Sequence, residues 1–280
     1  MCGRFTREYT WRQLHELLSL TIEFPEQWGD AAALAPSYNV APTQDSPVCR
    51  VARDGGGNGR SESEVAGSSG REVVPMQWGL RPAWVDKPGL APINARSETV
   101  ATSPMFRQAF RKRRCLVPVS GFYEWKKDGD RKRPHYIRLR DEPVMCFAGL
   151  WEFRVEGSNR NAEGANGAKD AEPRGGVGGR DAGQKLGHGD GGEEGTPLLT
   201  FTILTTGPNA LMRDIHDRMP VIVDPARFAE WLASDAPDPS LFEPFPADRM
   251  EAYEVSTRVN SPRNNGVGLL KPVEPDGLFG

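Results

Sequence analysis

Residues 115–125, Cys-Leu-Val-Pro-Val-Ser-Gly-Phe-Tyr-Glu-Trp, hold the pattern that decides the fold. Cys115–Val119 is a short apolar run that ends at Ser120-Gly121, which is typical of a β-strand. Comparable runs, β-branched or aromatic and bounded by Gly or Pro, recur at Val48–Val51, Val73–Gly79, Tyr136–Leu139, Val144–Leu150, Leu198–Thr205 and Tyr253–Val259. The sequence therefore predicts that strands form most of the structure.

Three segments are predicted to be helices. Thr10-x-x-Gln13 is a capping-box pattern ahead of leucines at helical spacing, and it predicts a helix over residues 10–20. Ser103-Pro104 and Asp224-Pro225 each join an N-cap residue to a proline that suits the first helical turn. Strands outnumber helices without a regular alternation of the two, so we expect an α+β fold built on a mixed or antiparallel sheet.

Two segments of low apolar content interrupt this pattern. One runs from Asp54 to Gly70, and the other covers about residues 156–195, with many Gly, Asn, Ala and Glu residues. Such segments bury too little apolar surface to offset the entropy of an ordered chain. We therefore expect one domain, residues 2–275, interrupted by disordered insertions at about 54–70 and 156–195.

Composition narrows the class of protein. The 280 residues include 24 prolines and 31 glycines, which favours a turn-rich fold. No apolar run is long enough to span a membrane, and charged residues stand where a signal peptide would be apolar, so we expect a soluble, cytoplasmic protein. The net charge of -3 means that any DNA-binding surface must be local. The four scattered cysteines indicate neither a disulfide framework nor a zinc site, and no other metal or cofactor is indicated.

Cys2 is the first candidate for chemistry. Aminopeptidases generally remove Met1 before a small residue, which leaves an α-amine and a thiol on adjacent carbons. Such a group condenses with an aldehyde, because the amine forms an imine and the thiolate then closes a five-membered thiazolidine. Ordinary pKa values of about 8 for the amine and about 8.5 for the thiol leave both groups partly nucleophilic at neutral pH. Position 2 alone does not distinguish this role from an incidental cysteine.

Three polar residues are candidate partners in that chemistry. Asn94 lies in residues 92–99, a polar run without strand or helix alternation, which predicts a positioned loop or a plain surface turn. Glu124 is framed by aromatic residues, which predicts a raised pKa suited to acid–base work; an outward strand position is the alternative. His216 has carboxylates on both sides and would pass protons to an imine, or else be a solvated loop histidine.

Aromatic and basic residues mark candidate nucleic-acid contacts. Trp78, Trp84 and Trp125 lie in strings rich in Gly and Pro, where they would stack on bases or belong to the core. Basic residues cluster over 107–114 beside the second predicted helix, where they would hold phosphates or form a solvated helix end.

Seven separate strings occur in a fixed order along the chain. They are Met1–Phe5, Tyr38–Pro42, Trp78–Leu80, Asn94–Arg96, Gly121–Trp125, Ile215–Pro220 and Val259–Pro262. Together they resemble the SOS-response-associated peptidase (SRAP) family of abasic-site processing proteins, over nearly all of the chain outside the two glycine-rich segments. The resemblance implies a compact fold around a β-barrel-like core, with a positively charged groove for single-stranded DNA that ends beside the N-terminus.

The resemblance also implies roles for individual residues. Cys2 matches the nucleophile that forms a thiazolidine with the ring-opened deoxyribose, and Asn94, Glu124 and His216 match the pocket around it. Glu124 would assist ring opening and proton movement, His216 would exchange a proton with the Schiff base and support reversal, and Asn94 would orient the sugar or the N-terminus.

DNA contacts are implied on the same basis. Arg96 and Arg218 match positions that grip phosphates beside the lesion. Lesser contributions are expected from Arg4, Asn39, Trp84 and Thr205. Pro104 stands where some relatives carry a basic residue, so one phosphate contact is expected to be missing.

Three functions remain open at this point. The leading hypothesis is a monomeric suicide cross-linker that shields abasic sites in single-stranded DNA, or at junctions with duplex, during the DNA damage response. It would associate with the nucleoid when bound there, and its imine intermediate would permit a lyase side reaction. The alternative is an N-terminal-nucleophile cysteine peptidase that removes its own Met1. The third hypothesis is a non-covalent DNA-binding or scaffold module.

Overall fold

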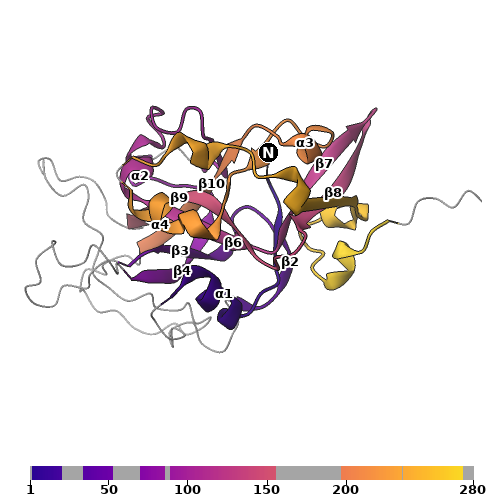
Figure 1. The fold of residues 1–280 in the computed structure, drawn as a ribbon, viewed down its shortest axis with the longest axis horizontal. Helices are drawn as coiled ribbons and strands as arrows, with labels where there is room; N and C mark the ends of the chain where they lie inside the picture. Colours follow the sequence, from indigo (N-terminus) through magenta and orange to yellow (C-terminus); the bar gives the residue numbers. More distant parts are fainter. Residues whose placement is uncertain are drawn as a thin grey trace, which may run out of the picture.

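The computed structural model describes residues 2–20, 34–52, 70–85, 89–155, 197–234 and 236–273. The insertions predicted at about 54–70 and 156–195 lie outside the described residues, apart from Gly70. Within the described part of the chain, strands make up most of the regular structure and short helices lie around them (Figure 1), which confirms the predicted α+β class.

A closed five-stranded barrel forms the larger part of the fold. Its strands are β3 (Asp45–Val51), β4 (Arg71–Trp78), β10 (Pro197–Thr206), β9 (Met145–Val155) and β6 (Arg114–Val119). Each pairs with the next in this order, and β6 pairs with β3 to close the ring. β4 and β10 run parallel whereas the other pairs are antiparallel, so the sheet is mixed and the expected barrel-like core is confirmed.

Three short strands extend the barrel beyond its ring. β5 (Asn94–Arg96) runs parallel to β10, β11 (Met219–Pro220) runs antiparallel to β10, and β12 (Ile222–Val223) pairs with β9. The prediction of a loop or surface turn over residues 92–99 is therefore wrong for its central three residues. A strand this short shows no alternation, and its partner Ile203 is far away in the sequence.

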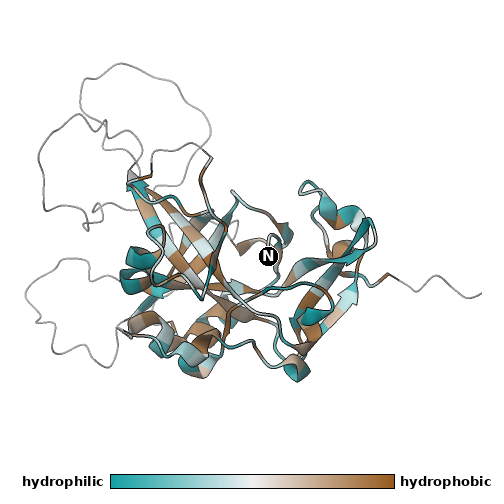
Figure 2. Ribbon diagram, turned by 90° about the horizontal axis from the view of Figure 1, so that it is seen from above, coloured by the Kyte–Doolittle hydropathy of each residue, from teal (hydrophilic) through white to brown (hydrophobic). Residues whose placement is uncertain are grey.

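A second, antiparallel sheet packs against the barrel. Its order is β13 (Met250–Glu254), β8 (Arg131–Leu139), β7 (Gly121–Asp128), β1 (Phe5–Arg7) and β2 (Ser37–Val40). Phe5 and Phe122 from this sheet share one hydrophobic cluster with Phe147 and Ile203 of the barrel. The barrel and the sheet lie side by side in Figure 2, and this shared cluster joins them.

The predicted cap of the first helix is confirmed. α1 (Trp11–Leu18) begins after Thr10, whose backbone N–H donates to Gln13 Oε1 at 2.8 Å, while the Gln13 N–H donates to Thr10 Oγ1 at 3.3 Å. Both halves of the capping box are thus present. Leu14 and Leu18 bury the inner face of this helix.

The other two predicted helices have different outcomes. Asp224 caps a 3₁₀ turn, η3 (Pro225–Arg227), that leads into α4 (Phe228–Ala233), as predicted. α2 (Arg107–Lys112) begins later than Ser103-Pro104 indicated and has no side-chain cap. The Ser103 carbonyl instead accepts from the backbone of Phe106 and Arg107 in a preceding turn.

The strand predicted over residues 253–259 ends early. β13 stops at Glu254, and the Ser256 side chain caps the 3₁₀ turn η6 (Thr257–Asn260). The remaining helical elements are α3 (Ala210–Arg213), η4 (Pro239–Phe242), η5 (Ala247–Arg249) and η7 (Val267–Leu270). None of the described helices has both the length and the apolar character needed to cross a membrane.

Candidate active site

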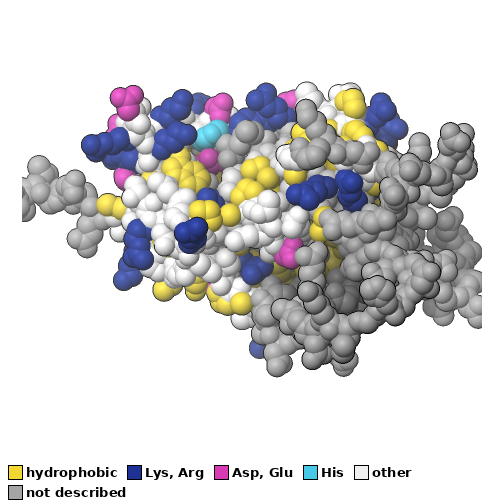
Figure 3. Space-filling model, turned by 180° about the vertical axis from the view of Figure 1, so that it is seen from behind, with side chains coloured by type: hydrophobic (Ala, Val, Ile, Leu, Met, Phe, Trp, Pro, Cys, Tyr) yellow, Lys and Arg dark blue, Asp and Glu magenta, His cyan; other side chains and the backbone are white. Residues whose placement is uncertain are grey.

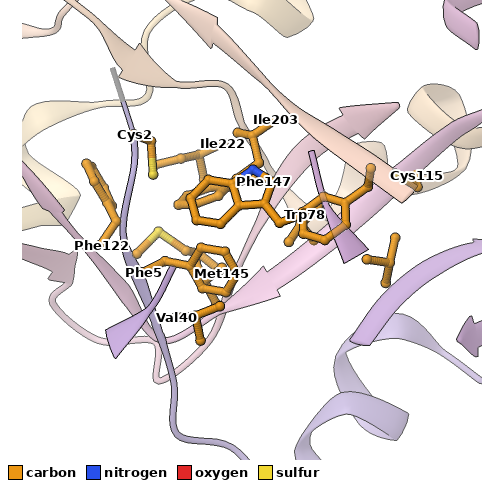
Figure 4. Packing of buried hydrophobic residues seen from close by; sticks show 14 of the residues in the cluster. Cys2, Phe5, Val40, Trp78, Cys115, Phe122, Met145, Phe147, Ile203 and Ile222 are labelled. Carbon is orange, nitrogen blue, oxygen red and sulfur yellow. The ribbon is translucent and has the colours of Figure 1, made fainter. Parts of the chain in front are cut away.

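Cys2 lies just before β1 with its side chain fully buried. Figure 4 shows its sulfur among hydrophobic residues that include Phe122 of β7 and Ile222 of β12. Burial, reinforced by the nearby Glu124 carboxyl, holds the pKa of the Cys2 thiol far above its usual range. The ordinary thiol pKa assumed from the sequence is therefore wrong for this buried side chain, which is neutral at neutral pH.

Asn94 holds the backbone of Cys2. Its Nδ2 donates to the Cys2 carbonyl oxygen at 2.8 Å, from the first residue of β5. Its Oδ1 is buried, and no group in the described part of the chain donates a hydrogen bond to it. Asn94 therefore fixes the position of residue 2 and keeps one buried acceptor for a further donor.

Glu124 lies on the inner face of β7, on the same side as Phe122. Its side chain is only 2% exposed, so the predicted alternative of an outward position is wrong. Burial raises the pKa of Glu124 to about 7, although the positive charge of the chain's amino terminus and the Trp125 backbone N–H oppose the rise. The carboxyl is thus divided between its two protonation states near neutrality, as its aromatic surroundings predicted.

His216 lies in the turn between α3 and β11, facing Glu124. Its Nε2 is 3.9 Å from Glu124 Oε2, and its side chain is 28% exposed. On the other side of the ring, Nδ1 lies 2.8 Å from Asp217 Oδ1 and accepts from the Arg218 backbone N–H at 3.0 Å. Burial, with help from the positive amino terminus, lowers the pKa of His216.

The four predicted catalytic residues come together from four parts of the chain. Cys2 precedes β1, Asn94 begins β5, Glu124 is on β7 and His216 follows α3. The site therefore lies between the barrel and the antiparallel sheet, and it joins a buried thiol to two groups that can exchange protons near neutral pH. Among the described residues, no group of three or more His, Cys, Asp or Glu is placed to hold a metal ion.

Arg4 is held in place by Asn39. The Arg4 Nη1 donates to Asn39 Oδ1 at 2.7 Å and to the Val259 carbonyl at 3.0 Å. Asn39 is only 2% exposed, and its Nδ2 donates to three backbone carbonyls of residues 259–264. Every polar atom of the Asn39 side chain thus bonds to protein.

Arg218 is held by a carboxylate that the sequence did not single out. Its Nη1 and Nη2 donate to the two oxygens of Glu98 at 2.5 and 2.9 Å. Nη2 also donates to the carbonyl oxygen of Thr205, which is fully buried. Arg96 is exposed on β5, two residues before Glu98. No local pattern reveals Glu98, because its partner lies 120 positions further along the chain.

The three tryptophans have different surroundings. Trp78 is fully buried, stacks on Phe201 and donates to the Ile93 carbonyl, so the base-stacking prediction is wrong for this residue. Trp125 is partly buried and donates to Asn260 Oδ1 at 2.8 Å. Trp84 is 50% exposed. Of these three tryptophans, Trp84 has the most exposed ring.

The basic run beside α2 is divided between surface and interior. Arg113 is buried and pairs with Glu152 at 2.8 Å, and buried Arg114 donates to the Trp231 carbonyl at 2.5 Å. The prediction that the run holds phosphates is therefore wrong for these two residues. Arg107, Arg111 and Lys112 are exposed.

A hollow of about 460 Å³ lies away from this site. Its lining includes Glu8, which follows β1, and Ser120, which precedes β7, and none of Cys2, Asn94, Glu124 and His216. The Ser120 hydroxyl accepts from the Glu8 N–H at 2.7 Å, and Arg138, also in the lining, donates to Glu251 at 2.6 Å. These polar groups bond to protein, and the hollow contributes no residue to the candidate site.

Comparison with known proteins gives the family of the chain. The family model described as SOS response associated peptidase (SRAP) matches residues 1–262. This chain belongs to the SRAP family. The match runs through all four residues gathered in the site, so the SRAP chain carries the family pattern over nearly its whole length.

Relatives of the SRAP chain occur in bacteria and vertebrates. It is 36% identical over 278 residues to "Abasic site processing protein YoqW" of Bacillus subtilis (strain 168), over 97% of this chain and 99% of the relative. Identity is 29% to "Abasic site processing protein YedK" of Escherichia coli (strain K12), over 98% and 100% of the two chains. It is 28% to "Abasic site processing protein HMCES" of Xenopus tropicalis, over 85% of this chain and 66% of that one.

Solved structures share the fold of the SRAP chain. A crystal structure of a protein from Bacteroides thetaiotaomicron matches with a TM-score of 0.69 and 22% identity, over 98% of this chain and all of that chain. A protein from Bordetella bronchiseptica matches with a TM-score of 0.60 and 19% identity, over 91% of this chain. At these identities the likeness concerns the fold alone.

Proposed function

We propose that this SRAP protein processes abasic sites in DNA by linking its N-terminal residue covalently to the lesion. Relatives over nearly the whole chain bear the name of abasic site processing proteins. The observation that carries the proposal is the surroundings of residue 2, where Asn94 holds the Cys2 carbonyl, the Glu124 carboxyl acts on the Cys2 thiol, and Glu124 Oε2 lies 3.9 Å from His216 Nε2. This arrangement supplies one positioning group and two proton carriers beside a terminal aminothiol.

The proposed reaction begins after Met1 is removed. The Cys2 α-amine attacks the aldehyde carbon of the ring-opened deoxyribose, and loss of one water gives an imine. The Cys2 sulfur then attacks the imine carbon, and the thiol proton passes to the nitrogen, which completes the thiazolidine. One C–N bond and one C–S bond replace the carbonyl C=O bond, and no oxidant or metal takes part.

Burial of the thiol supports a first step by the amine. A buried neutral thiol is a weak nucleophile, whereas an α-amine has an ordinary pKa of about 8. Glu124, with a pKa of about 7, is suited to protonate the sugar oxygen during ring opening and to accept a proton afterwards. His216 is suited to exchange a proton with the imine nitrogen, which would also permit reversal.

The proposed substrate is single-stranded DNA with an abasic site, including junctions with duplex, bound by a monomer. Lys and Arg side chains lie along the upper edge of the face in Figure 3 with Asp and Glu side chains among them, and the chain as a whole is slightly acidic. Arg96 and Arg218 would contact phosphates, and Trp84 would stack on a base. Buried Asn39 and Thr205 would act indirectly, because they hold Arg4 and Arg218 respectively.

Two further reactions can be considered at the same site, and the surroundings of Cys2 favour only one of them. The imine intermediate permits β-elimination, so we include a lyase activity in the proposal. Removal of Met1 by the Cys2 thiol itself is disfavoured, because that thiol is neutral and buried. Incubation of protein that retains Met1, without any aminopeptidase, tests this point: its intact mass is expected to stay constant.

A denaturing gel tests the proposed function. The mature protein is mixed with single-stranded DNA that contains one abasic site or none, and then heated in detergent. We expect a shifted band with the abasic strand only, no such band for Cys2→Ser, and a normal band for the matched Cys115→Ala variant. A stable adduct of Cys2→Ser at the wild-type yield would contradict the proposal.

A further inference from the structure

His216 has two polar neighbours that compete for the same ring nitrogen. The Arg218 backbone N–H lies 3.0 Å from Nδ1, and Asp217 Oδ1 lies 2.8 Å from the same atom. A backbone N–H can only donate, and a carboxylate can only accept. The two neighbours therefore suit different protonation states of one imidazole.

Each neighbour determines where the ring proton sits. In the neutral ring, Nδ1 accepts from the Arg218 amide, so the single proton is carried by Nε2, the atom 3.9 Å from Glu124. In the charged ring, Nδ1 also carries a proton, which it donates to Asp217. On this reasoning Nε2 is protonated in both states, and the proton that is gained and lost on titration is the one on Nδ1.

We propose that Asp217 is a positioning residue for His216: the Arg218 amide keeps the N–H of the neutral ring on the side that faces Glu124, and Asp217 accepts a hydrogen bond from Nδ1 when the ring gains its second proton. Asp217 is 86% exposed, so it connects the half-buried ring to solvent. The part of this inference that concerns DNA chemistry rests on the proposed function, whereas the tautomer and the proton's partner do not.

The charges around the ring determine the sign of the effect. Glu124 Oε2 on β7 lies 3.9 Å from its Nε2, Asp217 is next to it in the chain, and the charges of Lys127 and of the amino terminus also act on the ring. Burial lowers the pKa of His216 most, and the amino terminus and Lys127 lower it too, whereas Asp217 and the backbone of Arg218 raise it. Removal of the Asp217 charge therefore lowers the pKa further, so the ring loses its second proton at a lower pH.

The test follows the ring nitrogens of His216 by ¹⁵N NMR in the full-length protein, without DNA. The wild type is compared with Asp217→Asn, Asp217→Glu and the matched Asp214→Asn, whose exposed carboxylate stands on the other side of His216 in the chain. We expect the neutral wild-type ring to carry its proton on Nε2. The titration midpoint should fall in Asp217→Asn, return in Asp217→Glu and stay in place in Asp214→Asn.

High salt helps to separate the effects of Asp217→Asn and Asp214→Asn on the titration midpoint of His216. Salt screens the general effect of an exposed charge but weakens a direct hydrogen bond much less. We therefore expect the difference between Asp217→Asn and wild type to persist at high salt. Equal midpoints for Asp217→Asn and Asp214→Asn, or a neutral ring protonated on Nδ1, would overturn the inference.

A second measurement separates this inference from the proposed function. The pH dependence of cross-link formation on an abasic strand should shift in the same direction as the NMR midpoint in Asp217→Asn, and remain in place in Asp214→Asn. If the wild type forms no cross-link, the proposed function fails while the NMR result stands. If cross-linking occurs and neither its pH profile nor the NMR midpoint responds to Asp217→Asn, only the inference about Asp217 fails.

Discussion

Cys2 and Cys115 are both fully buried free thiols in one hydrophobic cluster, yet their surroundings differ. Burial raises the pKa of both thiols. Cys115 is enclosed in the barrel, whereas the backbone of Cys2 is held by Asn94 beside the carboxyl of Glu124. Burial of the thiol therefore does not by itself distinguish Cys2, the proposed nucleophile, from Cys115. The polar groups around the backbone of residue 2 distinguish it.

The largest effect on the cross-linking rate is expected from Glu124→Gln. This change takes away the carboxyl beside Cys2, which is the feature that separates the surroundings of Cys2 from those of Cys115. We expect the rate of cross-link formation at neutral pH to fall about 10²–10⁴-fold, the usual contribution of a positioned acid–base group. Single-turnover kinetics on an abasic strand measures this, with Glu16→Gln on the exposed face of α1 as control. A wild-type rate for Glu124→Gln would exclude Glu124 from the chemistry.

The same substitution is expected to change stability in a pH-dependent way. Burial raises the pKa of Glu124 from 4.5 to about 7, so the ionised form is disfavoured in the folded protein. Wild-type stability is unaffected by this group below about pH 4.5 and falls as the pH rises towards 7, by up to about 3 kcal/mol. The Glu124→Gln variant does not lose this stability, because glutamine does not ionise.

Urea unfolding near pH 5 and near pH 8 measures this difference. Glu124→Gln should gain stability relative to wild type between the two pH values, because only the wild type ionises a buried carboxyl. Cys115→Ala should keep a nearly constant difference from wild type, since its thiol stays protonated in the folded state throughout. A Glu124→Gln difference that does not change with pH would contradict the raised pKa.

A smaller effect is expected from Asn94→Ala. This change removes the hydrogen bond to the Cys2 carbonyl, and a bond of this kind is worth about 1 kcal/mol. We expect the cross-linking rate to fall about fivefold, because the terminal aminothiol is less well positioned. Asn264→Ala, which removes an amide that donates to the Arg258 carbonyl outside the site, is the control. Equal rates for the two variants would show that the bond to Cys2 is not needed.

The smallest effect concerns Arg218 and Glu98, at the edge of the site. Because Glu98 occupies both terminal nitrogens of Arg218, a phosphate has to displace it. Glu98→Gln is therefore expected to raise the affinity for intact single-stranded DNA a few-fold and to steepen its salt dependence, by up to about one phosphate contact. Fluorescence anisotropy at several salt concentrations measures both. Weaker binding would instead mean that Glu98 is needed to position Arg218.

Local patterns along the chain predicted much of the fold. Thr10 and Gln13 cap α1, and Asp224 caps the turn before α4, because each signal involves residues only a few positions apart. β5 was missed since three residues are too few for alternation and its pairing depends on β10. For Trp78 and Arg113 the local sequence leaves both a surface and a core position open. Their partners Phe201 and Glu152 come from distant strands, so no local pattern shows that both residues are buried.

The candidate site also has some properties that neighbouring residues predict and others that depend on distant parts of the chain. The aromatic frame of Glu124 indicated a raised pKa from adjacent residues alone. The high pKa of Cys2 was not predicted, since β7 and β12 come from far along the chain to bury it. Glu98 was missed for a related reason, since only the folded chain brings it to Arg218. Sequence thus indicated the candidate residues, and three-dimensional contacts determine their surroundings.

The central claim is that nitrogen and sulfur of one residue bind a single carbon of the lesion. Intact-mass analysis of the Met1-free protein, mixed with single-stranded DNA that carries one abasic site, tests it directly. We expect the summed mass less one water, unchanged by borohydride, with one fewer alkylatable cysteine than the four in the sequence. An adduct that gains two hydrogens with borohydride, or that leaves all four cysteines alkylatable, would contradict it.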